Sequence, residues 1–124
     1  MYKQYNPNPK AAQVGDCVIR ACAVALGEDW DSVYAGIAAQ GFAMKDMPSS
    51  NRVWGAWLKS KGCRRGIFHD GCDGDYTLAD FCDEFNQGRY VAIMDGHAVA
   101  VVDGDYYDTW DSGNEAVCGF WEVL

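Results

Sequence analysis

The spacing of apolar residues changes along the chain, and this change constrains the fold more than any other feature of the sequence. Before about residue 90 the apolar residues recur mainly at helical spacing, as they do over residues 53–58. Beyond that point, short apolar or alternating runs are separated by Asp95-Gly96 and Asp103-Gly104, dipeptides typical of hairpin turns. Helices followed by hairpin-linked strands predict an α+β fold whose sheet is largely antiparallel.

Caps and helix breakers give the expected bounds of these elements. Pro7 and Pro9 disfavour a helix near the start, so residues 1–13 should form an extended lead-in. Four helices should follow: Cys17–Leu26 before Gly27, one from Asp29 or Asp31 to Gly41, one from Ser49 or Ser50 to Gly62, and one from a Thr77–Asp80 capping box to Gly88. The expected strands are Tyr90–Met94, His97–Val102, Tyr106–Trp110 and Val117–Val123.

Size and composition indicate one globular domain spanning residues 1–124. Of the 124 residues, 49% are hydrophobic and 23% charged, and neither a repeat nor an internal linker divides them. No apolar run approaches the roughly 18 residues of a membrane span, and MYKQYNPNPK at the start lacks the apolar core of a signal peptide. We therefore expect a cytoplasmic protein with no membrane partner. The formal net charge of −8 argues against nucleic acid, whose phosphates would be repelled.

The charge is unevenly distributed between the two halves of the chain. Residues 1–65 contain nine Lys or Arg and five Asp or Glu, whereas residues 66–124 contain one and thirteen. We expect the two halves to pack together and partly neutralise each other. The alternative is a groove with an acidic wall that prefers cationic substrates.

Six cysteines raise the question of disulfides and zinc. A disulfide framework is disfavoured without a signal peptide, and no Cys-x-x-Cys pair suggests zinc. The acidic segment around His69 lacks the spacing of a calcium loop and is interpreted as a solvated loop, so no metal and no other cofactor is expected. Five cysteines are interpreted as small packing residues: Cys22, Cys63, Cys72, Cys82 and Cys118.

Cys17 is treated separately, because Gly15-Asp16 places it at or beside the N-terminus of the first helix. The helix dipole and the unpaired N–H groups there favour a thiolate. A nearby imidazolium would lower the pKa of the thiol further. Cys17 is therefore a candidate nucleophile, and the alternative is a buried packing residue.

The last hairpin brings a histidine and a carboxylate together. A two-residue turn at Asp103-Gly104 pairs Val102 with Asp105. Counting back along both strands makes His97 and Asp108 diagonal neighbours on one face, about 7–8 Å apart along the backbone. In such a pair the carboxylate selects the imidazole tautomer and stabilises its charged form. The alternatives are a histidine satisfied by the backbone and an aspartate that caps the turn.

Three segments carry these residues in the order Cys, His, Asp: GDCVIRA at 15–21, GHAVAVVDG at 96–104 and YDTWDS at 107–112. Their order and setting resemble the papain-like cysteine peptidase superfamily, in particular its compact C39-like bacterial and phage branch. The resemblance implies a papain-like α+β fold, with N-terminal helices packed on a C-terminal antiparallel sheet and the nucleophile at the start of the central helix. It implies Cys17 as the nucleophile, His97 as general base and acid, and Asp108 as the residue that orients the histidine.

The same resemblance suggests further site residues and a location. Papain-like enzymes usually have a Gln six residues before the cysteine that helps to form the oxyanion hole, but this chain has Ala11 there. Gln13, four residues before the cysteine, is therefore the oxyanion-hole candidate, with Asn8 or Asp16 as alternatives. Trp110 is the candidate wall of the cleft. The implied location is the cytoplasm of a bacterium or of a phage-infected host cell.

The expected activity is hydrolysis of a peptide or isopeptide bond in a peptide or protein substrate, through a Cys-His-Asp triad and a thioester intermediate. Two alternatives share the fold: a catalytically weak or inactive module that binds a peptide or protein partner, and a deamidase or amide transferase.

Asp111 is a rival to Asp108, although its opposite parity points it to the other face of the sheet. In this arrangement an acidic wall would lie on the His97 side of the cleft.

Overall fold

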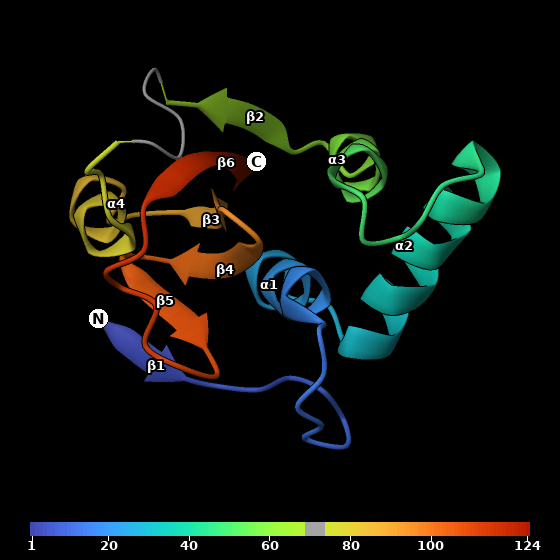
Figure 1. The fold of residues 1–124 in the computed structure, drawn as a ribbon, viewed down its shortest axis with the longest axis horizontal. Helices are drawn as coiled ribbons and strands as arrows, with labels where there is room; N and C mark the ends of the chain where they lie inside the picture. The colour runs from blue at the N-terminus through green and yellow to red at the C-terminus, as the bar shows by residue number, and fades with distance from the viewer. Residues whose placement is uncertain (69–73) are drawn as a thin grey trace.

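A computed structural model describes residues 1–68 and 74–124. Over these residues the chain forms an α+β fold with four helices and a mixed, open six-stranded sheet (Figure 1). The helices are α1 (Cys17–Leu26), α2 (Trp30–Met44), α3 (Asn51–Ser60) and α4 (Leu78–Glu84). The strands are β1 (Tyr2–Gln4), β2 (Arg64–Ile67), β3 (Arg89–Met94), β4 (His97–Val102), β5 (Asp105–Asp108) and β6 (Val117–Val123).

The sheet has the strand order β1-β5-β4-β3-β6-β2. All neighbouring strands are antiparallel except β1, which runs parallel to β5 at one edge. The expected pairing of Val102 with Asp105 is confirmed. Asp103 and Gly104 between them both have positive φ, as a two-residue hairpin turn requires. The antiparallel part of the prediction is therefore confirmed, whereas β1 and β2 were not expected as strands.

Helices cover both faces of the sheet, which accounts for the continuous apolar runs in its central strands (Figure 1). On one face α1 lies against β3 and β4, with α2 and α3 outside it, and this core includes Val33, Val53 and Leu58. On the other face α4 packs through Leu78 and Phe81. The sheet therefore presents His97, at the start of β4, beside the N-terminal end of α1.

Small side chains let α1 approach the sheet closely. Ala21 and Ala25 on the helix belong to the same buried cluster as Ala98 and Ala100 of β4. The helix ends at Gly27, which adopts the left-handed conformation (φ 68°). Its backbone N–H donates to the carbonyl oxygens of Ala23 and Val24 in the last turn. A substitution that enlarged one of these alanines would move α1 relative to β4, and with it the first residue of the helix.

Helix α2 continues past Gly41, where the sequence predicted its end. The left-handed cap is Lys45 instead, with φ 56°. Gly41 is required for packing, because a Cβ atom there would lie 2.8 Å from the backbone oxygen of Asp46 and 3.3 Å from the Pro48 nitrogen. The glycine therefore accommodates the returning chain and does not stop the helix.

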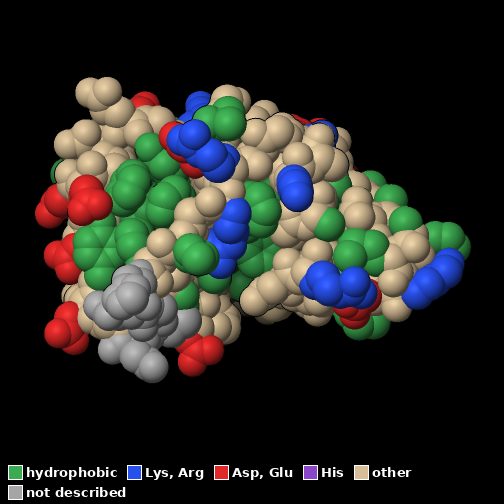
Figure 2. All heavy atoms as spheres, turned by 90° about the horizontal axis from the view of Figure 1, so that it is seen from above, with side chains coloured by type: hydrophobic (Ala, Val, Ile, Leu, Met, Phe, Trp, Pro, Cys, Tyr) green, Lys and Arg blue, Asp and Glu red, His purple; other side chains and the backbone are tan. Residues whose placement is uncertain are grey.

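The two differently charged halves of the chain pack against each other. Acidic side chains gather at the α4 end of the molecule, and basic ones lie over its middle and toward α2 (Figure 2). Among the described residues, ion pairs that join the halves include Arg64 with Glu122, Arg20 with Asp108, and the N-terminal amine of Met1 with Asp105. These contacts agree with the expected partial neutralisation of the two halves.

The cysteines have different environments. Cys22, Cys63 and Cys82 are buried and free, as expected of packing residues. Cys118, on β6, is disulfide-bonded, so its interpretation as a free packing thiol is wrong. The expectation against disulfides therefore does not hold for this residue. Cys72 and the acidic segment around His69 lie outside the described residues.

Two further properties concern membrane spans and metal sites. None of the helices in residues 1–68 and 74–124 has the length and apolar character needed to cross a bilayer. Within the same ranges, no group of three or more His, Cys, Asp or Glu side chains is arranged to hold a metal ion.

Candidate active site

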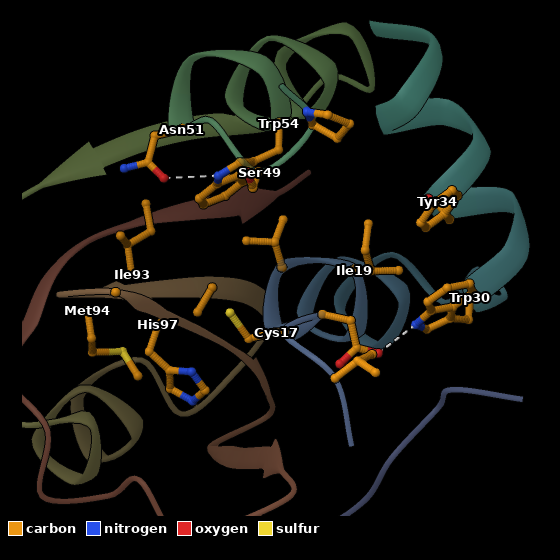
Figure 3. Close-up of a pocket in the computed structure, with 17 residues that line it drawn as sticks. Cys17, Ile19, Trp30, Tyr34, Ser49, Asn51, Trp54, Ile93, Met94 and His97 are labelled. Atoms are coloured by element: carbon orange, nitrogen blue, oxygen red, sulfur yellow. Dashed lines mark hydrogen bonds between the residues drawn. The ribbon is translucent and has the colours of Figure 1, made fainter. Parts of the chain in front are cut away.

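Cys17 and His97 face each other across the seam between α1 and β4 (Figure 3). Cys17 is the first residue of α1, and its half-buried thiol is free. The thiol makes a side-chain hydrogen bond with His97 and also accepts one from the backbone N–H of Ala98. The sequence thus predicted the position of Cys17 at the helix start, and the structure brings His97 to it.

The other side of the imidazole contacts Asp108. Its Nε2 lies 2.7 Å from Asp108 Oδ2, which leaves Nδ1 for the hydrogen bond with Cys17. Asp108 is 2% exposed and ends β5, on the strand next to His97. Asp111, the rival carboxylate, accepts instead from the Tyr106 hydroxyl. The structure therefore places His97 between Cys17 and Asp108, in contact with both.

Other donors hold the Asp108 carboxylate in this orientation. Ser112 Oγ donates to Oδ2 at 2.6 Å, and the Thr109 N–H donates to Oδ1 at 2.8 Å. The Arg20 guanidinium lies 3.5 Å from Oδ1. Tyr2 and the backbone N–H of Tyr5 bind the main-chain oxygen of Asp108 instead. With these contacts the carboxylate has a defined orientation toward the imidazole.

The electrostatics of the three residues favour a thiolate and an imidazolium. Burial disfavours the charged form of the Cys17 thiol, but the hydrogen bonds from His97 and Ala98 outweigh it and lower the pKa of Cys17. Burial likewise opposes the charge on His97, yet the hydrogen bonds with Asp108 and Cys17 raise its pKa to about 9. Burial opposes the charge on Asp108 too, but the hydrogen bonds from His97, Ser112 and Thr109 together outweigh it and lower the pKa of Asp108. The three shifts all favour a thiolate–imidazolium pair backed by a carboxylate.

Trp110 covers the histidine from the solvent side. Its ring centroid is 5.1 Å from that of His97, with the two planes inclined at 33°, and Trp110 is 46% exposed. The predicted wall residue therefore packs against the imidazole, but it is not among the described residues that line the cavity.

Gln13 is the predicted oxyanion-hole residue. Its side chain is exposed, and Gln13 is absent from the described residues that line the cavity at Cys17. Asn8, one alternative donor, uses its amide nitrogen to bind Asp16 Oδ2 at 3.2 Å. Asp16 itself is a hydrogen-bond acceptor for Arg20 and Trp30. The groups best placed beside the thiol are thus the main-chain N–H groups at the start of α1.

A cavity of about 500 Å³ opens beside Cys17 and His97. It lies between the first turn of α1, the starts of α2 and α3, and the β3–β4 turn (Figure 3). Aromatic side chains line it: Trp30 stacks on Tyr34 with ring centroids 5.1 Å apart, and Trp54 forms part of the α3 side. The indole nitrogens of Trp30 and Trp54 are already bonded, to Asp16 and Asn51. The surface offered to a ligand is therefore mainly apolar.

The acidic wall considered for the His97 side is not found. That side of the cavity consists of Ile93, Met94, Gly96 and Ala98 with the histidine. Among the described lining residues, Asp16 is the sole carboxylate, and it is bonded to Arg20. The excess of acidic residues in the second half of the chain lies elsewhere, so it does not select cationic groups in this cavity.

Sequence reasoning missed two residues of the site. Arg20 has a recognisable signal, because it is the one charged residue in the apolar α1 sequence and lies four residues after Asp16. Ser112 is 1% exposed and follows β5 in an irregular segment, so no periodic pattern points to it. No family model, curated protein or solved structure matches this chain.

Proposed function

We propose that this protein is a thiol hydrolase of papain-like type that cleaves a peptide or isopeptide bond. One observation carries the proposal: Cys17, at the N-terminus of a helix, is hydrogen-bonded to His97, whose other nitrogen is bonded to the buried Asp108 at 2.7 Å. A packing cysteine needs neither the imidazole nor the carboxylate behind it. The arrangement has the three groups that nucleophilic catalysis by a thiol requires.

The chemistry follows from these contacts. The Cys17 thiolate attacks the carbonyl carbon, and the main-chain N–H groups of the first turn of α1 stabilise the oxygen that becomes negative. The His97 imidazolium gives its proton to the leaving amine as the C–N bond breaks, leaving a thioester on Cys17. Water then attacks the thioester with neutral His97 as base, which releases the carboxylic acid and regenerates the Cys17 thiolate and the His97 imidazolium.

The cavity suggests which substrates fit. Its volume of about 500 Å³ and its aromatic walls favour a bulky apolar side chain near the scissile bond. Apart from Asp16 and the catalytic pair, the described lining offers little to compensate a buried charge. Peptides with an aromatic or branched aliphatic residue should therefore be cleaved in preference to those with Lys or Glu at that position.

The test is turnover of a mixed peptide library, followed by mass spectrometry. We expect wild-type protein to cleave a subset of peptides, with cleavage lost in Cys17→Ala and in His97→Ala. Ammonia release without cleavage would replace the peptidase by a deamidase with the same triad. Neither reaction, together with binding of peptides by the wild type, would overturn the catalytic proposal in favour of a binding module.

A further inference from the structure

Asp16 holds the capping position of α1 but does not cap the helix. Its side chain makes no bond to the N–H groups of the first turn. The carboxylate, 7% exposed, instead accepts from Arg20, from Trp30 Nε1 at 2.9 Å and from Asn8 Nδ2 at 3.2 Å. An aspartate at this position ordinarily satisfies one of the first N–H groups of the helix. Here that carboxylate is held away from them.

This diversion matters because the same turn supplies Cys17. Gly15, Asp16, Cys17 and Val18 all line the cavity, so a substrate carbonyl reaching the thiol would meet the start of α1. N–H groups without a side-chain cap can stabilise a thiolate and then an oxyanion. A capping carboxylate would occupy these donors and place a negative charge next to the nucleophile.

Arg20 links this carboxylate to the third member of the triad. One guanidinium nitrogen, Nη1, binds Asp16, and the other, Nη2, lies 3.5 Å from Asp108 Oδ1. The side chain is only 11% exposed, so the contacts are shielded from water. The planar fork of an arginine can hold two carboxylates at once, whereas a lysine ammonium is a single point charge. Arg20 therefore contacts both the aspartate that precedes α1 and the aspartate that ends β5.

We propose that Arg20 is a positioning residue that holds the Asp16 carboxylate off the N-terminal N–H groups of α1 and the Asp108 carboxylate toward His97. This inference rests on the proposed function, since it assigns Arg20 a role in activating Cys17. The charged groups around the thiol are His97 from β4 and Arg20 from its own helix, with Asp16 and Asp108 behind them. Removing the guanidinium leaves the two buried carboxylates without their shared counter-ion, which disfavours a nearby thiolate.

The experiment measures the rate of Cys17 alkylation by iodoacetamide against pH, by peptide mapping, in wild type, Arg20→Met and Arg20→Lys. Arg20→Met should raise the pH midpoint of alkylation by about one unit, equivalent to a roughly tenfold lower rate below the midpoint. Arg20→Lys should lie between the two, because it keeps the charge but not the fork. Arg52→Met is the matched control, since Arg52 also pairs with an aspartate, Asp46, but is exposed and is not among the described residues that line the cavity.

The results of this experiment distinguish failure of the positioning role of Arg20 from failure of the proposed function on which that role rests. If wild-type Cys17 reacts no faster than free cysteine, the proposed function fails. If wild-type Cys17 is activated and a folded Arg20 variant keeps the wild-type midpoint, the positioning role is overturned. Thermal unfolding identifies folded variants, and Arg20→Lys supplies the decisive comparison if Arg20→Met does not fold. A merely structural role would lower stability in these variants without moving the midpoint.

Discussion

Replacing Asp108 by Asn is the sharpest test of whether this carboxylate raises the pKa of His97. The substitution keeps the size of the side chain and one oxygen, which can accept from Ser112 or from Thr109, because these two groups donate to different oxygens of Asp108. It removes the negative charge 2.7 Å from His97 Nε2. A hydrogen bond to a charged group contributes about 1.5–3 kcal/mol, and each pKa unit corresponds to about 1.4 kcal/mol. The pKa of His97, about 9 in the wild type, should therefore fall by about one to two units.

The assay is an NMR titration of the imidazole resonances. The chain has only two histidines, so replacing His69 by Gln assigns the spectrum. His97 should stay protonated up to about pH 9 in the wild type and lose its proton at lower pH in Asp108→Asn. Asp111→Asn is the matched control, because Asp111 binds Tyr106 and should leave His97 unchanged. Equal titration of His97 in wild type and Asp108→Asn would refute the reasoning.

Three further predictions concern the surroundings of the triad and the core. Trp110→Ala should slow Cys17 alkylation about 2–10-fold, because the aromatic pair of Trp110 with His97 contributes about 0.5–1.5 kcal/mol. Trp110→Phe should retain most of the rate. Equal alkylation rates in wild type and Trp110→Ala would contradict a role of Trp110 in supporting His97. Tyr34→Asp places a carboxylate on an exposed position of the cavity lining, so it should shift cleavage toward peptides containing Lys in a competition assay. A wild type that already prefers peptides containing Lys would contradict the apolar character of the cavity. Phe81→Ala should lower the free energy of unfolding in urea by about 3–5 kcal/mol, since Phe81 is fully buried among aromatic rings, while the exposed Phe42→Ala should change it by less than about 0.5 kcal/mol.

The sequence predicts the triad because each of its members has a local signal. Apolar residues ending at Gly27 define α1, and the two-residue turn at 103–104 determines the register of β4 against β5. From that register alone His97 and Asp108 share a face. What the sequence cannot supply is the distance from α1 to β4, because this depends on how Ala21 and Ala98 meet in the core.

Elements formed by distant pairing escape prediction for the same reason. Strand β1 has three residues and exists because Tyr2–Gln4 lies beside Tyr106–Asp108, more than one hundred residues away. Gly41 looked like a helix end, but its role is close contact with the backbone of Asp46. Arg20 and Ser112 converge on Asp108 only after the sheet and α1 have packed together. Local patterns therefore predict elements and register, and tertiary packing decides the supporting contacts.

The most direct test of the central claim is selective alkylation of Cys17 by iodoacetamide near neutral pH. Cys22, Cys63 and Cys82 are internal controls, because burial raises the pKa of each of these thiols. An activated thiolate predicts that Cys17 reacts faster than these cysteines and faster than free cysteine, and that the advantage is lost in His97→Ala. A Cys17 that reacts no faster than free cysteine, or equally fast with and without His97, would contradict the account.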